Sequence, residues 1–445
     1  MFGYDPDVSI VPPTVNGDIS ADFAPCFKAQ IFIQECPEMP QSILTDEFFE
    51  SFSSSILDLS EAESLPPACY VDREFFDFEK KTLFFKEWLC VGRESWIKEP
   101  GDYFTSKHVG EPIVITRTKT GEIAAMSSVC QHRGMLVAEG RGHARGLICP
   151  YHHWFYSLTG ELVAAPEMGQ TCNFNRANHN LPRLKVETWQ GFIFVNFDED
   201  AAPLGPRLGE LDPVVANYDL ANLEGPPPSD AARYNWNWKV MFENNNDGYH
   251  ANRLHKGPLH DPIPSALAGF PELSEECAGY YRTNGSLHPD ASFNPTHKAL
   301  FPVFPSLTDA ERRRVAFVNI PPALSLVMNT DMILYLIIQA EDADHHSMVI
   351  GSLVAPGAMQ NPLFDQLMAF NQQSIGEIVA QDLHVDELVQ QGLKSKFAPR
   401  GRYSWQEGAQ CQLNKWLVRR YWSAWESLKA ESPSAALRAK PRVVS

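Results

Sequence analysis

Cys130-Gln131-His132 and Cys149-Pro150-Tyr151-His152, separated by sixteen residues, decide how this 445-residue chain folds. Each stretch joins a soft thiolate to an imidazole over a spacing short enough to close around one metal centre. The remaining cysteines are scattered without ligand spacing, so we expect them to be reduced thiols and not a disulfide framework. The two Cys/His pairs therefore predict a metal site in the first half of the chain.

Two chemistries fit this ligand set. In a Rieske [2Fe-2S] cluster, two cysteines hold one iron and two histidines hold the other. In a zinc site of the Cys2His2 kind, one pair normally holds both cysteines and the other both histidines. Each pair here mixes the two residue types, which favours the cluster. The flanking residues Arg133-Gly134 and His153-Trp154-Phe155-Tyr156 also resemble the Rieske pattern of the ring-hydroxylating oxygenases.

Composition sets further bounds. With 44% hydrophobic and 21% charged residues the chain is ordinary for a soluble globular protein, and its net charge of -18 argues against nucleic-acid binding. The sequence contains neither an export signal nor an apolar run long enough to span a membrane, so we expect a cytoplasmic protein. It also lacks a dinucleotide-binding fingerprint, so the electrons for any redox chemistry must come from another protein.

The pattern along the chain predicts an α+β protein of two domains. Residues 1–70, rich in Pro, Ser and acidic residues, read as an extension with at most one short helix near residues 45–57. Residues 71–205 would form the cluster domain, in which a helical stretch at residues 75–88 precedes residues 103–196, which alternate apolar and polar positions as antiparallel strands do. Residues 206–445 run from a helix through β-branched strands to a long helix, an order that suits a helix packed over an antiparallel sheet, the helix-grip arrangement.

A second metal site is needed because a Rieske cluster only passes single electrons. His250 and His255 are the candidates, since two imidazoles and one carboxylate on one face leave iron(II) with open positions for oxygen. On a regular helix they would lie about 140° apart, so binding one metal requires a distortion or an end to the helix between them. Gly257-Pro258 supplies a stop nearby.

The carboxylate is sought on the last amphipathic helix. Asp382 falls in the middle of an apolar face formed by Ile375, Ile378, Val379, Val385 and Val389. A carboxylate in such a place is costly unless it is paired or bound to metal. Asp386 lies near the edge of the same face and is the second candidate.

These residues carry a resemblance to the α subunits of the Rieske non-haem iron oxygenases. Asp247-x2-His250-x4-His255 resembles their mononuclear iron motif, and Gln381-Asp382 with the following Val389-Gln390-Gln391-Gly392-Leu393 resembles the segment that supplies the carboxylate. The resemblance implies that His250, His255 and Asp382 bind Fe(II), while Cys130, His132, Cys149 and His152 bind the [2Fe-2S] cluster. It also implies that Asp247 bridges the cluster of one subunit to the iron of its neighbour in a homotrimer, with or without a β subunit.

The family's activity gives the expected function: a terminal oxygenase that takes electrons from a reductase, with or without a ferredoxin, and uses O2 on a small molecule. The preferred prediction is an aromatic substrate, which the enzyme would hydroxylate by mono- or dioxygenation or would oxidatively demethylate. The Gln390-x-Gly392-Leu393 ending looks more like the group that acts on quaternary amines such as choline and carnitine, whereas Asp247 favours aromatic substrates. Two rivals stay open: a Rieske ferredoxin-type carrier, and a zinc-stabilised binding module without catalysis.

Overall fold

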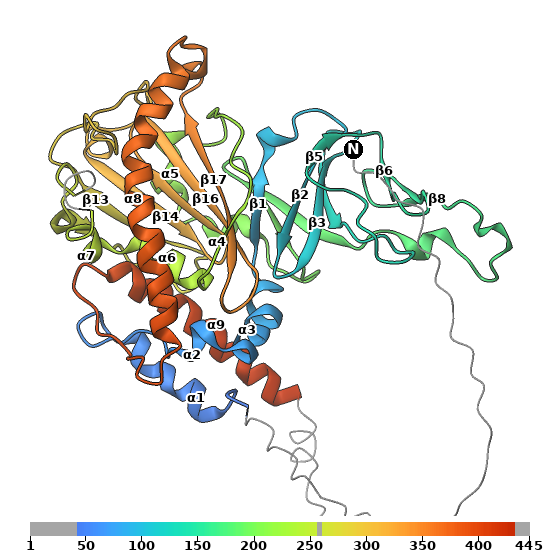
Figure 1. Ribbon diagram of the computed structural model, residues 1–445, viewed down its shortest axis with the longest axis horizontal. Coiled ribbons are helices and arrows are strands. Elements are labelled where there is room, and N and C mark those ends of the chain that lie inside the picture. Colours follow the sequence, from blue (N-terminus) through green and yellow to red (C-terminus); the bar gives the residue numbers. More distant parts are fainter. Residues whose placement is uncertain (1–41, 256–259, 432–445) are drawn as a thin grey trace, which may run out of the picture. The chain divides into compact units, whose positions relative to one another are not determined.

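The computed structural model describes residues 42–255 and 260–431, and its centre is built from antiparallel sheets (Figure 1). One seven-stranded sheet has the order β1-β10-β9-β4-β3-β2-β5, and a three-stranded sheet has the order β6-β7-β8. A second seven-stranded sheet has the order β11-β17-β16-β15-β14-β13-β12. The predicted α+β class, with a β-rich first part and a helix-over-sheet second part, is confirmed.

The strands of the first seven-stranded sheet and of the small sheet all come from the predicted cluster domain. In the first sheet they are β1 (Leu89–Arg93), β2 (Asp102–His108), β3 (Glu111–Arg117), β4 (Ile123–Ser127), β5 (Arg141–His143), β9 (Arg183–Trp189) and β10 (Phe192–Asn196). The small sheet holds β6 (Leu147–Ile148), β7 (Phe155–Tyr156) and β8 (Leu162–Ala164).

The second seven-stranded sheet belongs to the predicted catalytic domain. Its strands are β11 (Ala232–Tyr234), β12 (Ala268–Gly269), β13 (Tyr280–Gly285), β14 (Arg314–Ile320), β15 (Leu324–Met328), β16 (Met332–Ala340) and β17 (His346–Val354). The α-helices are α1 (Asp46–Glu50), α2 (Ala68–Val71), α3 (Arg73–Glu79), α4 (Leu204–Leu208), α5 (Asp212–Val215), α6 (Trp238–Asn246), α7 (Gly248–Ala251), α8 (Phe364–Leu393) and α9 (Gly408–Glu431). No helix in the described part of the chain has both the length and the apolar character needed to cross a membrane.

The second sheet is buried on both faces, which explains why its strands read as near-continuous apolar runs. Helix α8 runs across one face (Figure 1). The other face meets the first sheet, where the ring of Phe192 in β10 lies edge-on to Tyr335 in β16 at 5.5 Å. Backbone pairing adds to this contact, because Val109 N donates to Ala340 O at 2.8 Å. One apolar core therefore runs through both predicted domains.

Residues 42–70, part of the predicted extension, pack on the catalytic part of the chain. The short helix expected near residues 45–57 is present as α1 and a following 3-10 turn, Ser51–Ile56. Phe49 in α1 stacks on Trp425 in α9 with ring centroids 4.5 Å apart. Residues 1–41 lie outside the described part of the chain. The domain limits at 70 and 205 stay predictions.

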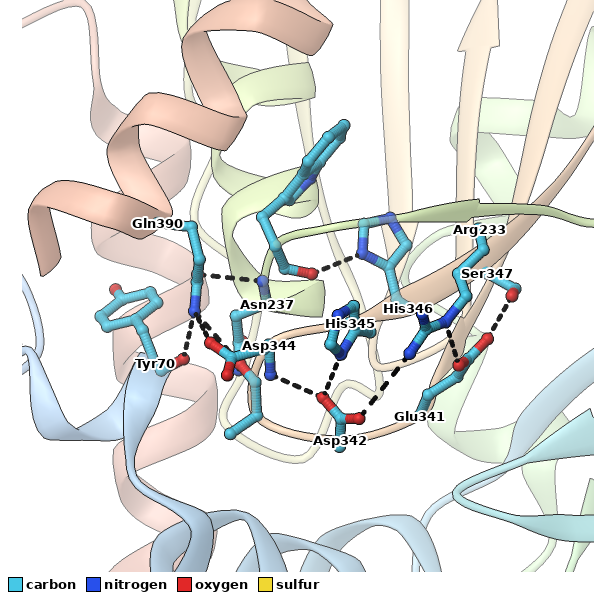
Figure 2. Close-up of polar contacts among 12 residues, drawn as sticks. Tyr70, Arg233, Asn237, Glu341, Asp342, Asp344, His345, His346, Ser347 and Gln390 are labelled. Carbon is cyan, nitrogen blue, oxygen red and sulfur yellow. Dashed lines mark hydrogen bonds and ion pairs between the residues drawn. The ribbon is translucent and has the colours of Figure 1, made fainter. Parts of the chain in front are cut away.

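A buried polar cluster joins the two helices that flank the candidate iron site (Figure 2). Gln390 of α8 accepts a hydrogen bond from the backbone N of Asn237, the N-cap of α6, at 3.0 Å. Its amide nitrogen donates to the carbonyl of Tyr70 at 3.1 Å and to the Asp344 carboxylate at 2.9 Å. Gln390 thus fixes α8 relative to α6, and these two helices carry the candidate carboxylate and lead to the candidate histidines.

Candidate metal centres and substrate pocket

Both Cys/His pairs lie on tight turns of the first half of the chain. The first pair follows β4, and the second lies in the turn between β6 and β7. Gly134 N donates to Cys130 O at 3.0 Å, and His153 N donates to Cys149 O at 3.0 Å. Gly134 adopts a φ of +78°, which glycine tolerates better than other residues and which lets the first turn close.

The turns bring the two imidazoles together. His132 Nδ1 lies 3.1 Å from His152 Nδ1, so both rings direct the same nitrogen to one point. The indole of Trp154 stacks on His132 at 4.8 Å and holds its plane. Cys130 and Cys149 are buried beside these rings and form no disulfide. Two buried thiols and two converging imidazoles fit a Rieske cluster, with the thiols on one iron and the imidazoles on the other.

Tyr156 supports the first thiol. Its hydroxyl lies 3.3 Å from Cys130 Sγ and accepts a hydrogen bond from the backbone N of Gln131 at 3.1 Å. Burial raises the pKa of the Cys130 thiol, while the Tyr156 hydroxyl acts to lower it. A donor at this place stabilises the thiolate form that a metal requires.

The second pair of histidines depends on a break in the helix that carries them. Helix α6 ends before Asp247, whose backbone is extended, and Asp247 then caps the short helix α7. Its carboxylate accepts from Tyr249 N at 2.6 Å and from His250 N at 3.2 Å. Because α7 ends at Ala251, His255 is free of the 140° separation of a regular helix. The distortion required by the sequence is therefore present; the proposed stop at Gly257-Pro258 lies outside the described residues.

His250, His255 and Asp382 converge on one point. Ligand atoms of the three residues all lie within 4.8 Å of one another. Asp382 Oδ1 is 2.8 Å from His255 Nε2 and 3.5 Å from His250 Nε2. The two Nε2 atoms are 3.2 Å apart. Two imidazoles and one carboxylate gathered in this way fit the donor set of a non-haem iron(II) site with open positions.

Neighbouring side chains orient these donors. Asp247 Oδ2 lies 3.0 Å from His250 Nδ1, and Gln381 Oε1 lies 2.8 Å from His255 Nδ1. An acceptor on each Nδ1 favours a proton there and leaves the Nε2 lone pair for a metal. The amide of Asn244 donates to Asp382 Oδ1 at 3.3 Å.

The two candidate carboxylates differ in their protonation. Burial raises the pKa of Asp382, but hydrogen bonds to His250 and His255 outweigh this effect and the pKa is lowered overall. Burial raises the pKa of Asp386 to about 8, and the charge of Asp382 adds to the rise. Near neutral pH, Asp382 is therefore ionised and Asp386 mostly protonated. The ionised group is the better ligand for a hard cation.

The helix face around these residues differs in part from the predicted one. Helix α8 buries Asp386 and Gln390, whereas Val389, expected on the apolar face, is 41% exposed. The face turned inward toward the helix end is polar because Gln390 takes part in the cluster of Figure 2.

An apolar pocket of about 170 Å³ adjoins the triad. An apolar cavity of ~150 Å³ is enough to hold a benzene molecule. Its lining from the sheet and α8 includes Phe317, Val327, Leu334, Leu336, Ile375 and Ile378. Size and lining suit a small organic substrate with its reacting carbon near the triad.

Several supporting residues were missed from the sequence. Trp154, Tyr156 and Gln381 lie within the quoted motifs, but the spacing of the metal-binding residues predicts no role for them. Arg282 of β13 lines the pocket and lies in a segment in which the sequence shows no motif. Only the three-dimensional contacts identify these four.

Comparison with known proteins agrees with the geometry. Residues 87–186 match the model of the Rieske [2Fe-2S] domain, and residues 220–423 match that of the ring hydroxylating alpha subunit catalytic domain. These ranges contain the Cys/His pairs and the triad, respectively. The fold and the two candidate sites thus define a protein with an iron-sulfur domain followed by a mononuclear iron domain.

Relatives of two kinds are similar to the chain. The carnitine monooxygenase oxygenase subunit of Acinetobacter baumannii is 32% identical over 259 residues, 56% of this chain and 65% of the relative. The large component of the naphthalene 1,2-dioxygenase system of Pseudomonas putida is 34% identical over 53% of this chain and 54% of the relative. The matched region therefore spans less than two thirds of either relative.

Solved structures share the fold. A quaternary ammonium Rieske monooxygenase superimposes with a TM-score of 0.70 at 23% identity, covering 82% of this chain and 96% of the other. Naphthalene 1,2-dioxygenase from Rhodococcus sp. gives a TM-score of 0.72 at 21% identity, covering 88% and 100%. The chain thus contains a Rieske [2Fe-2S] domain and a ring hydroxylating alpha subunit catalytic domain, and its relatives are large subunits of Rieske oxygenases.

Proposed function

We propose that the chain is the terminal oxygenase component of a multicomponent Rieske oxygenase, which uses O2 and electrons from a reductase, with or without a ferredoxin. The observation that carries this proposal is the convergence of His250, His255 and Asp382 beside an apolar pocket, in a chain that also holds two Cys/His pairs. A reaction site and an electron-entry site in one chain are what an oxygenase component needs. A cytoplasmic location is part of the same proposal.

In this proposal Cys130, His132, Cys149 and His152 hold the [2Fe-2S] cluster, and His250, His255 and Asp382 hold Fe(II). When bound, the cluster supplies single electrons and the mononuclear iron supplies oxygen activation. The protein keeps a proton on Nδ1 of His250 through Asp247 and on Nδ1 of His255 through Gln381. The apolar lining excludes water and places the substrate beside the triad.

Asp247 is proposed to connect the two sites between subunits. Within one chain it contacts His250, and among the described residues no hydrogen bond, ion pair or ring contact joins the Cys/His pairs to the triad. The turn of the second pair presents Tyr151, 54% exposed, and Tyr249 beside Asp247 is 51% exposed. We infer a homotrimer, with or without a β subunit, in which His152 of one chain meets Asp247 of the next. One similar solved structure is described as revealing inter-subunit electron transfer.

An aromatic substrate, hydroxylated by mono- or dioxygenation or oxidatively demethylated, is the preferred class. Support comes from the apolar pocket and from the likeness to naphthalene dioxygenase. A quaternary amine is the second candidate, supported by the likeness to carnitine and glycine betaine monooxygenase subunits.

A single-turnover experiment tests the proposal. Dithionite-reduced holoenzyme is mixed with O2 and naphthalene, benzoate or L-carnitine, and both cluster reoxidation and oxygenated product are followed. We expect product from one of these probes, a steep loss of product in Asp247→Asn with both metals retained, and wild-type yield in the exposed control Asp77→Asn. Wild-type yield in Asp247→Asn would refute the bridging role, and the absence of both metals from the purified chain would refute the oxygenase.

A further inference from the structure

Arg282 brings a buried positive charge to the wall of the apolar pocket. It lies in β13, is 5% exposed, and is the cross-strand partner of Phe317 in β14. Its guanidinium carbon stands 3.6 Å from the centroid of the Phe317 ring, so the flat face of the guanidinium is covered. Both side chains line the pocket that contains the triad.

The edges of this guanidinium are poorly satisfied. An arginine side chain has five N–H donors and no acceptor. Within residues 42–255 and 260–431, Arg282 makes one hydrogen bond, from Nη2 to the carbonyl of Asn245 at a long 3.4 Å, and its buried Nε has no partner. Among the described residues, no carboxylate lies within 4.0 Å of it. The charge of Asp247 acts to raise the pKa of Arg282, but burial outweighs it. A buried charge without a directly paired carboxylate is costly, so its presence on a cavity wall calls for a partner.

Arginines elsewhere in the molecule show how the fold normally satisfies this group. Arg207 and Arg420, both mostly buried, share the carboxylate of Glu87 at 2.8 Å and 2.6 Å. Arg93 is also buried and stacked on a ring, but it donates to Leu220 O at 2.8 Å and does not line the pocket. Arg282 differs because its side chain lines the pocket next to the triad.

We propose that Arg282 binds a carboxylate carried by the substrate. A carboxylate matches the fork of a guanidinium, and the two form charge-assisted hydrogen bonds. The pocket then divides into three parts: Arg282 for the anionic group, the apolar lining for the body of the molecule, and the triad for the reacting carbon. This inference rests on the proposed function and narrows its substrate to a small organic acid, which includes both aromatic carboxylates and the zwitterionic betaines.

Calorimetric binding to the holoenzyme tests this assignment with two matched pairs of probes. Benzoate carries a carboxylate where benzamide carries a neutral amide. L-carnitine and choline share a quaternary ammonium, but only carnitine carries a carboxylate. We expect the acid of at least one pair to bind at least about 10-fold more tightly than its partner, since charged hydrogen bonds are the stronger ones. The pair that shows the preference identifies the aromatic or the betaine source. Equal binding within both pairs would overturn the proposal.

Substitutions then assign the preference to Arg282. Arg282→Gln should weaken binding of the preferred acid by at least about 30-fold and abolish the preference, because one partner of a buried charge pair is lost. Arg282→Lys should lie between, and Arg419→Gln, which removes a half-exposed charge paired with Glu275, should behave as wild type. A preference retained in Arg282→Gln would overturn the proposal. The wild-type comparison needs no substitution, so the test stands even if Arg282→Gln fails to fold.

Metal analysis separates this inference from the proposed function. A chain with cluster and iron in which the acids show no preference would refute only the role of Arg282. A chain without either metal would refute the oxygenase, whatever the binding data show.

Discussion

Replacement of Asp382 and Asp386 by Asn, one at a time, tests the iron ligand assignment. An amide keeps the size of the carboxylate and removes its charge. Asp382 Oδ1 lies 2.8 Å from His255 Nε2, so Asp382→Asn removes the negative donor from the point where three ligands meet. Asp386 has a pKa raised by burial to about 8, so Asp386→Asn replaces a mostly neutral acid with a neutral amide near pH 7.

The expected magnitudes follow from these environments. Residues that only orient metal ligands are worth 10- to 100-fold in metal affinity, so loss of a ligand itself should cost about 100-fold or more, ~2.7 kcal/mol. Asp386→Asn should leave iron affinity near that of wild type. Iron is measured by metal analysis after dialysis, and the visible absorbance of the cluster serves as an internal standard. Iron retained in Asp382→Asn but lost in Asp386→Asn would refute the assignment and move the ligand one turn along α8.

Three further changes have distinct expected outcomes. His132→Ala or His152→Ala should bleach the visible cluster absorbance, because a Rieske iron cannot stay bound through one imidazole. His153→Ala, at the exposed neighbouring residue, should keep this absorbance, and an unchanged spectrum in His152→Ala would disprove the assignment. Lys239→Met should lower the free energy of unfolding by about 3–5 kcal/mol, because Lys239 and Glu79 form a fully buried ion pair at 2.9 Å. The control Lys86→Met, which removes the more exposed ion pair with Asp198, should lower it by at most about 1 kcal/mol, and equal losses in denaturant titrations would contradict this reasoning. Burial lowers the pKa of His108 from 6.5 to about 4, so between these pH values the unfolded state binds one more proton than the folded state, and the free energy of unfolding falls on acidification by about 1.4 kcal/mol per pH unit. His108→Gln should remove this pH dependence, and the exposed control His143→Gln should keep it. An unaltered pH dependence in His108→Gln would refute His108 as the cause.

The sequence predicts those features that depend on the spacing of a few residue types along the chain. Cys130, His132, Cys149 and His152 are proposed as cluster ligands from spacing, since a metal centre needs such donors close together, and the structure brings the two imidazoles to 3.1 Å of each other. The long helix is predicted from its apolar period, and the structure places it at Phe364–Leu393.

Other features need the folded chain. The sequence predicts a break in the helix near His250, but its place before His250 and the capping contacts of Asp247 with Tyr249 N and His250 N are seen only in the structure. The choice between Asp382 and Asp386 depends on burial and on hydrogen bonds from two distant histidines. Arg282 lies on a strand far from every motif, and only the pairing of β13 with β14 brings it to the pocket.

The most direct test of the oxygenase proposal is the metal content and colour of the purified chain. Four cluster ligands and the triad predict a coloured protein with about three irons per chain. Removal of one triad residue, as in His250→Ala, should lower the content to about two irons while the colour stays. About two irons in the wild-type chain, with no loss in His250→Ala, would indicate an electron carrier without a reaction site. A colourless protein that contains zinc would contradict the proposal outright.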